Sequence, residues 1–163
     1  MRVSSAIRLR SDAVRKHLAG IGLYKKGSDE IYTPEMTDRT YSRLIELGVG
    51  LAARGYRVVL DAKFDRRAKR AAAIAQTNAQ NLPLIFLYCT APPEVLRARV
   101  EQRDGDIADA TAAILAKQSM EPFDQSEPMV IVDTTQTIDE IQQQLSSVFD
   151  TFASLSKPNQ VQQ

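Results

Sequence analysis

Four short apolar segments along the chain predict the strands of a sheet. The first alternates apolar and polar residues over Ser5–Arg10, and the last covers Met129–Thr134. Between them, Arg57–Leu60 and Pro83–Cys89 are almost continuously apolar. Continuous apolar and β-branched runs are typical of parallel strands that are covered on both faces. We therefore expect the segment at Pro83 to be an interior strand, with Cys89 in a packing role.

Apolar residues at helical spacing between these segments predict the helices. Ser11 or Asp12 is the expected N-cap of the first helix, and Thr33 followed by Pro34 is expected to open the second. Further helices are predicted over residues 66–81, from 90–94 to 103, and over 110–120. A final helix, after the strand at Met129, is predicted from an inward stripe made of Ile138, Ile141, Leu145, Val148 and Phe149. This order of elements indicates an α/β fold with parallel strands and right-handed crossovers.

Small residues mark two of these helices. Gly48 and Gly50 weaken the interior of the second helix, which indicates close packing on the sheet. The helix over 66–81 carries a small-residue face, formed by Ala68, Ala71, Ala72 and Ala75. Both features favour helices that lie close against neighbouring elements.

Composition narrows the class of protein. The chain has 163 residues, of which 44% are hydrophobic, and this predicts one globular domain over 1–155 with a flexible tail at 156–163. With a net charge of +1, the chain has no overall positive field that would attract nucleic acid or an anionic membrane. The single cysteine excludes an intrachain disulfide, and one Cys with one His makes a zinc site improbable. We expect a cytoplasmic protein with no membrane contact.

An acid stands at the end of the second predicted strand. Asp61 follows Val58–Leu60, and cations come next in Lys63, Arg66 and Arg67. Ligands of open α/β sheets bind beyond the carboxyl ends of the strands, so these side chains are aimed at a site. An acid that can hold Mg²⁺ beside several cations suits phosphate chemistry. The alternative is that Asp61 caps the following helix and the arginines form a solvated face.

Other candidates have equally plain alternatives. Asp12 and Arg15 are three residues apart and lie on one face of the first helix. They are either an acid and an anion-binding arginine at the mouth of the sheet, or a helix cap and a surface ion pair. Tyr41 can face a ligand or the core. The stretch Gly22–Ser28 has the glycine spacing of a phosphate-binding loop. However, it lacks the lysine after the second glycine and follows no buried strand, so we reject it as a Walker A motif.

Four segments in order resemble one known family. They are Leu-Arg-Ser-Asp-Ala-Val-Arg-Lys at 9–16, Ile-Tyr-Thr-Pro-Glu-Met-Thr at 31–37, Val-Val-Leu-Asp-Ala-Lys-Phe at 58–64 and Ala-Pro-Pro-Glu-Val-Leu-Arg-Ala-Arg at 91–99. Over about residues 6–135 the chain is similar to P-loop kinases described as AAA-family ATPases. These are related to polynucleotide kinase, zeta-toxin kinases and chloramphenicol phosphotransferase. They are often fused to an aminoglycoside-phosphotransferase-like domain.

The resemblance implies roles for individual residues. Asp12 matches a general base for the acceptor hydroxyl, and Arg15 an arginine that holds an anionic part of the substrate. Asp61 resembles the Walker B acid near Mg²⁺. Arg99 and Arg103 are the best matches to lid arginines that close over the phosphates of ATP, and Arg97 is a further match. The expected substrate-binding residues are Arg15, Arg66, Arg67 and Tyr41.

Two departures from the family matter. Lys63 stands where the family usually has Thr, so it adds a phosphate contact or displaces the metal. The family also begins with a buried strand, a G-K-[S/T] loop and a helix, and no G-x-x-x-x-G-K-[S/T] occurs in this sequence. The expected fold is a three-layer P-loop NTPase-like parallel sheet with helices on both faces, without its central strand and P-loop. The remaining strands either pair across the gap or leave two unpaired edges, which would favour self-association.

Three hypotheses follow. The first is the bulk of an ATP-dependent kinase that phosphorylates a hydroxyl of a small-molecule or nucleotide-like acceptor, with little turnover by this chain alone. The second is a catalytically degenerate member that serves as a nucleotide- or partner-binding module. The third is an unrelated α/β scaffold with solvated charges, and the four ordered segments disfavour it.

Overall fold

The strands form two parallel pairs. In the computed structural model, which describes residues 6–25, 27–102 and 119–155, β1 (Ile7–Arg10) pairs with β2 (Val58–Asp61). In the same way β3 (Phe86–Thr90) pairs with β4 (Met129–Asp133). All four lie within or next to the apolar segments of the sequence, which confirms those strands. The tail at 156–163, the helix predicted over 110–120 and Arg103 lie outside the described residues.

The helices follow the predicted order. They are α1 (Ser11–Leu18), α2 (Pro34–Ala52), α3 (Arg67–Ala79), α4 (Pro93–Glu101) and α6 (Ile138–Leu155), with a short 3-10 helix over Asp29–Tyr32. As expected, Thr33 is the N-cap of α2, and its Oγ1 accepts a hydrogen bond from the Met36 amide at 3.2 Å. No helix of the described chain is long and apolar enough to cross a membrane.

The start of α1 differs from the prediction. Ser11 and Asp12 are already helical, and Arg10 occupies the N-cap position without a side-chain cap. The reason is that α1 begins directly at the end of β1, which leaves no turn residue between the two. Asp12 instead sits in the first helical turn, where a carboxylate is stabilised by the positive end of the helix dipole.

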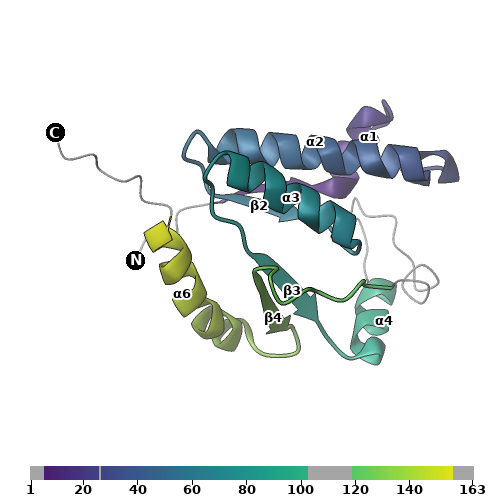
Figure 1. The fold of residues 1–163 in the computed structure, drawn as a ribbon. Coiled ribbons are helices and arrows are strands. Elements are labelled where there is room, and N and C mark those ends of the chain that lie inside the picture. The colour runs from purple at the N-terminus through teal and green to yellow at the C-terminus, as the bar shows by residue number, and fades with distance from the viewer. Residues whose placement is uncertain (1–5, 26, 103–118, 156–163) are drawn as a thin grey trace.

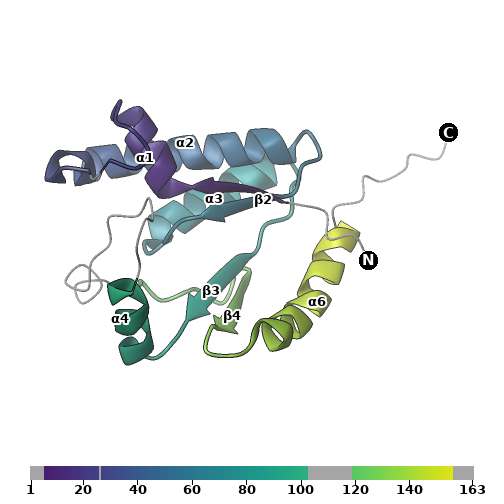
Figure 2. The same cartoon turned by 180° about the vertical axis from the view of Figure 1, so that it is seen from behind.

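The two strand pairs remain separate sheets. The order is β1-β2 in one and β3-β4 in the other, and no ladder joins β2 to β3 within the described residues. Figures 1 and 2 show β2 and β3 on the inner sides, with β1 and β4 outward. The expectation that β3 is an interior strand is therefore wrong for this structure. Leu87 is 37% exposed, and Cys89 is exposed rather than packed.

A row of aromatic rings connects the two sheets. Tyr41 of α2 contacts Phe64, just after β2, with ring centroids 5.2 Å apart. Phe64 contacts Phe86 of β3 at 5.6 Å, and Phe86 contacts Phe123 at 6.0 Å. We call these four residues the aromatic row. Its first three members form the buried hydrophobic core with Ile45 and Ala73, and Phe123 packs against that core, so one core serves both strand pairs.

Helix burial corrects two details of the sequence pattern. The buried positions of α3 are Arg70, Ala73 and Thr77, whereas the small-residue face (Ala68, Ala71, Ala72 and Ala75) is exposed. In α6, Ile138 is 74% and Phe149 50% exposed, so they do not belong to the inward stripe. The face of a helix depends on where its neighbours lie, and small or apolar side chains by themselves do not decide it.

The two glycines inside α2 have different surroundings. A Cβ on Gly48 would lie 2.6 Å from Leu60 Cδ2 of β2, so the absence of a side chain lets helix and strand approach closely. A Cβ on Gly50 would meet nothing within 4 Å. Close packing on the sheet is therefore confirmed for Gly48 and wrong for Gly50.

This contrast gives a matched pair of variants. We expect Gly50→Ala to raise the free energy of unfolding by about 1 kcal/mol, because alanine is the better helix former. Gly48→Ala makes the same local gain but must displace Leu60, and overpacking costs about 1–3 kcal/mol. Urea denaturation of both variants measures the difference. Equal stabilisation by both would contradict the close contact between α2 and β2.

Candidate functional site

The candidate residues gather at the carboxyl ends of the strands. In the β1–β2 pair Arg10 is the register partner of Asp61, so both strands end at the same edge of the sheet. Because α1 starts at Ser11, Asp12 follows Arg10 by only two residues and belongs to that edge as well. The topology thus places Asp12 at the same edge of the sheet as Asp61, the edge at which ligands of open α/β sheets bind.

Asp61 is already engaged with two arginines. Its Oδ2 accepts hydrogen bonds from Arg8 Nε at 2.9 Å and from Arg8 Nη2, and it lies 3.5 Å from Arg10 Nε. The alternative that Asp61 caps α3 is wrong, because Arg66 occupies that N-cap position. The side chain of Asp61 remains 40% exposed, so ligands can reach it.

Lys63 contacts an acid of its own loop. Its Nζ lies 3.4 Å from Asp65, and Lys69 Nζ lies 3.3 Å from the same carboxylate. Partial burial by itself would raise the pKa of Asp65, but the charges of Lys69 and Lys63 outweigh burial and lower that pKa. Asp65 is therefore a firmly ionised anion between two cations, and it neutralises much of their charge.

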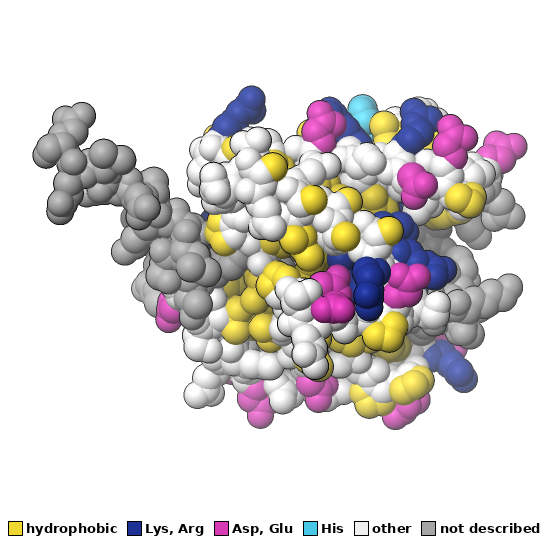
Figure 3. Space-filling model, in the orientation of Figure 1, with side chains coloured by type: hydrophobic (Ala, Val, Ile, Leu, Met, Phe, Trp, Pro, Cys, Tyr) yellow, Lys and Arg dark blue, Asp and Glu magenta, His cyan; other side chains and the backbone are white. Residues whose placement is uncertain are grey.

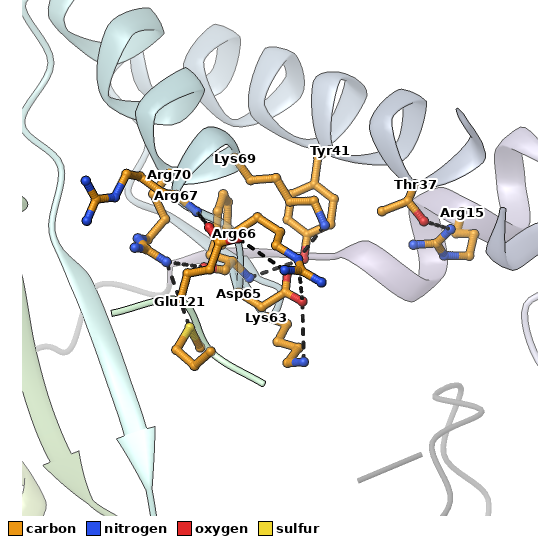
Figure 4. Close-up of polar contacts among 12 residues, drawn as sticks. Arg15, Thr37, Tyr41, Lys63, Asp65, Arg66, Arg67, Lys69, Arg70 and Glu121 are labelled. Atoms are coloured by element: carbon orange, nitrogen blue, oxygen red, sulfur yellow. Dashed lines mark hydrogen bonds and ion pairs between the residues drawn. The ribbon is translucent and has the colours of Figure 1, made fainter. Parts of the chain in front are cut away.

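Tyr41 holds the backbone of this loop. Its hydroxyl oxygen accepts a hydrogen bond from the Phe64 amide at 3.2 Å, and Lys69 Nζ lies 4.3 Å from its ring centroid (Figure 4). Burial raises the pKa of Tyr41. Phe64 has φ +46°, a strained value for a bulky residue. These contacts give Tyr41 a packing role, which is the second of its two predicted readings.

Arg66 and Arg67 contact acids brought in from a distant segment. Arg66 Nη1 donates to Glu121 Oε1 at 3.1 Å, and the Arg67 amide donates to Glu121 Oε2 at 2.6 Å. Arg67 Nη1 also lies 3.7 Å from Asp124. Figure 3 shows acidic and basic side chains interleaved on this face. The carboxylates of Glu121 and Asp124 partly neutralise the two predicted substrate-binding arginines.

Arg15 lies apart from this cluster, next to the start of α2 (Figure 4). It is 8% exposed, and its Nη1 donates to Ile31 O at 2.9 Å and to Thr37 Oγ1 at 3.1 Å. Its guanidinium also lies over the ring of Tyr32, 5.1 Å from the centroid. Arg15 thus fixes the 3-10 helix and α2 against α1.

The predicted lid arginines that the structure describes belong to the other strand pair. Arg97 is exposed on α4. Arg99 donates from Nη1 to Thr134 Oγ1 at 2.7 Å and from Nη2 to Thr134 O at 2.6 Å. Because the Thr134 amide bonds to Thr90 O, Arg99 lies at the carboxyl ends of β3 and β4. Arg99 therefore lies at the carboxyl edge of the β3–β4 sheet, as Asp61 does at the carboxyl edge of the β1–β2 sheet.

Arg70, to which the sequence pattern assigned no separate role, is fully buried. Its Nε donates to Glu127 Oε1 at 2.7 Å and its Nη1 to Phe64 O at 3.1 Å. Its guanidinium also lies 4.2 Å from the ring centroid of Phe123. Arg70 therefore links α3, the loop after β2 and the segment before β4. The signal in the sequence was its spacing: Arg70 is three residues before Ala73 and seven before Thr77, so the three share one helical face.

The described residues offer only part of a metal site. They contain no group of three or more His, Cys, Asp or Glu side chains that could hold an ion. Asp61 is one carboxylate, and Arg8 and Arg10 already neutralise it. Mg²⁺ in kinases is held by one or two carboxylates together with substrate phosphates. The residues present therefore do not fit a Mg²⁺–ATP complex without further groups.

Comparison with known proteins agrees with the topology. The model of the AAA domain family matches residues 1–124, which is most of the chain. This chain belongs to that family. The family is P-loop kinase-like, as the four ordered sequence segments indicated. No curated protein matches the sequence.

Solved structures show the same fold. A sugar kinase from Janibacter sp. HTCC2649, solved without ligand, has a TM-score of 0.62 at 18% identity, covering 94% of this chain and 84% of its own. A gluconokinase from Sinorhizobium meliloti 1021 has a TM-score of 0.61 at 20% identity, covering 91% and 79%. At such identities the similarity shows the P-loop kinase-type α/β fold of this AAA domain protein.

The Arg70–Glu127 pair predicts how stability depends on pH. Hydrogen bonds from Arg70 lower the pKa of Glu127 below its ordinary value of 4.5. The stabilisation is therefore present above about pH 4.5 and is lost as the pH falls through the lowered pKa. We expect Glu127→Gln to lose on the order of 3 kcal/mol at neutral pH, because it leaves a buried guanidinium without its carboxylate.

Urea denaturation between pH 3 and pH 7, roughly the span over which such a carboxyl titrates, checks this prediction. The variant should lose less further stability below pH 4.5 than the unaltered chain. Glu46→Gln, which removes an exposed carboxylate paired with Arg43, is the control and should cost less than about 1 kcal/mol. Equal stability of Glu127→Gln and the unaltered chain at neutral pH would refute the role of this pair.

Proposed function

We propose that this protein carries the acceptor side of an ATP-dependent kinase, which transfers a phosphoryl group to a hydroxyl of a small molecule. The observation that carries the proposal is the joint position of Asp12 and Asp61 at the carboxyl ends of paired strands in a P-loop kinase-like fold. Phosphoryl transfer needs positioned charge more than covalent chemistry, and this edge supplies acids and cations.

Asp12 acts as the general base. Its carboxylate takes the proton of the acceptor hydroxyl as that oxygen forms a bond to the γ-phosphorus of ATP. The bond from this phosphorus to the β,γ-bridging oxygen breaks, and ADP leaves. The position of Asp12 in the first turn of α1 supports this role, because the turn is at the mouth of the sheet and starts immediately after β1.

The chain alone is expected to hold nucleotide weakly. Its sequence contains no G-K-[S/T] loop, the element whose backbone N–H groups and lysine hold the phosphates of ATP. Arg8 must also release Asp61 before that carboxylate can face a cation. Turnover therefore requires an added segment with such a loop.

The acceptor is proposed to be a hydroxylated anion, such as a sugar acid, or a nucleotide-like compound. The names of the two similar structures, a sugar kinase and a gluconokinase, support the first class. Arg66 and Arg67, which are more than half exposed, are the cations that could exchange Glu121 and Asp124 for a substrate anion.

The second candidate function is a binding module of the same fold that no longer transfers phosphate. The pairing of Asp61 with both Arg8 and Arg10 favours it, because a neutralised acid is a poor metal ligand.

Calorimetry with Mg²⁺ and ATP distinguishes the two functions. The titration uses this chain and a version extended by a strand, a G-x-x-x-x-G-K-[S/T] loop and a helix. We expect only the extended form to bind ATP, and to phosphorylate gluconate or a nucleoside in a coupled ADP assay. Binding without any turnover across sugar acids, sugars and nucleosides favours the second function, and absence of binding by both forms refutes the kinase proposal.

A variant of the base tests its role in the extended form. We expect Asp12→Asn to lower kcat by about 10²–10⁴-fold while ATP binding stays the same, since the amide cannot accept the proton. The matched control is Asp38→Asn, which alters an exposed acid of α2 and should leave kcat unchanged. Full turnover by Asp12→Asn would exclude Asp12 as the base.

A further inference from the structure

Tyr32 lies between two anchored points of the chain. It is the last residue of the 3-10 helix that precedes α2. Ile31, just before it, is buried, and its carbonyl accepts a hydrogen bond from Arg15 Nη1 at 2.9 Å. Thr33, just after it, caps α2, and Thr37 Oγ1 accepts a second bond from Arg15 at 3.1 Å. The backbone that carries the Tyr32 ring is therefore fixed on both sides.

One side of this ring is covered and the other faces solvent. The Arg15 guanidinium carbon lies 5.1 Å from the centroid of the Tyr32 ring, and Arg15 itself is buried. Tyr32 is nevertheless 41% exposed, so its exposed part lies on the side away from Arg15. Tyrosine is enriched at binding surfaces because one part of the side chain packs on protein while the other stays wet. The Tyr32 ring has this arrangement.

The topology brings the exposed ring to the candidate site. Helix α2 packs on β2 through Gly48 and Leu60 and leads into that strand, so it begins near the edge where the strands end. Figures 1 and 2 show α1 beside this end of α2. Asp12 and Arg15 are one turn of α1 apart, with Cβ atoms about 5–6 Å from each other. A compound of nucleoside length that contacts Tyr32 can therefore extend to Asp12.

We propose that Tyr32 is a specificity-determining residue of the acceptor site and that its exposed face stacks on a planar aromatic ring of the acceptor. Arg15 is a positioning residue, since it holds the Tyr32 ring from the covered side. The inference rests on the proposed function. It narrows the acceptor to a hydroxylated compound that carries a planar aromatic ring, such as a nucleoside.

The cation behind the ring favours a planar partner over a sugar acid. A guanidinium is attracted by the negative face of an aromatic ring and draws electron density toward itself. The opposite face of Tyr32 is then less negative, which favours stacking with the electron-rich face of a second ring. An acyclic sugar acid has no such face and meets the tyrosine only through C–H groups, which prefer a more negative ring.

An NMR titration of the chain as it stands, without ATP, tests the proposal. The probes are inosine and ribose, which share the pentose and differ in the base. The protein has five tyrosines and no tryptophan, so the ring resonances that disappear in Tyr32→Leu identify Tyr32. We expect inosine to move these resonances upfield through the ring current of the stacked base. Ribose should leave them in place.

Matched variants locate the contact. Tyr32→Leu removes the stacking face and should raise the Kd of inosine about tenfold or more, whereas Tyr32→Phe keeps the ring and should restore binding. The control is Tyr56→Leu, which alters a tyrosine that is 55% exposed just before β2, at the opposite edge of the sheet. It should leave the Kd unchanged. The comparison of inosine with ribose uses the unaltered chain, so it stands even where a variant fails to fold.

A double-mutant cycle tests the positioning role of Arg15. Arg15→Met should raise the Kd of inosine several-fold where Tyr32 is present, because the ring is no longer held in place. In the Tyr32→Leu background the same change should add nothing, since the residue through which Arg15 acts is gone. Equal effects in both backgrounds would assign Arg15 a general structural role and overturn this part of the proposal.

Three further outcomes would overturn the proposal. They are no shift of the Tyr32 resonances with inosine, equal shifts with inosine and ribose, and an unchanged Kd of inosine in Tyr32→Leu, which would place the base elsewhere. The titration contains no ATP and measures no turnover. Its failure therefore refutes the stacking role alone, while failure of the proposed kinase function is recorded separately by the ATP binding and ADP assays.

Discussion

Contact between aromatic rings is the interaction on which the arrangement of this protein depends. Two strand pairs that share no backbone ladder within the described residues are held in one core by the aromatic row. Each ring pair contributes about 0.5–1.5 kcal/mol beyond the burial of its surface. Phe64 is central to the row because it contacts Tyr41 of α2 on one side and Phe86 of β3 on the other.

The same residue shapes the loop that follows Asp61. A positive φ at a phenylalanine costs about 1–3 kcal/mol, and it persists only where the surroundings fix it. Here the Phe64 amide donates to Tyr41, and its carbonyl accepts from the buried Arg70. Packing and hydrogen bonds therefore offset the strain, and they place Lys63 and Asp65 at the edge of the first sheet.

Charge at that edge is closely balanced. Lys63 and Lys69 share Asp65, while Arg66 contacts Glu121 and Asp61 contacts Arg8. Most of these side chains are partly exposed, and ion pairs at exposed positions contribute only about 0–1 kcal/mol. They can be exchanged for a ligand at low cost. Arg70 and Glu127 are different, because their pair is buried and has a structural role.

The sequence alone determined the elements and their order. Apolar runs located all four strands, Thr33 and Pro34 marked the start of α2, and the ordered segments around Asp12 and Asp61 indicated the family. These features are local: strand runs, caps and motifs are set by neighbours along the chain. The common edge of Asp12 and Asp61 also followed, since parallel strands end on one side.

Only the tertiary structure decided which groups meet. It separated the strands into two sheets, exposed Cys89 and Leu87, and buried Arg70 instead of the alanines of α3. It also gave Asp61 two arginine partners and gave Arg66 and Arg67 the acids of a segment more than fifty residues away. Such contacts depend on how distant elements pack against one another, and no periodicity within a single segment encodes that arrangement.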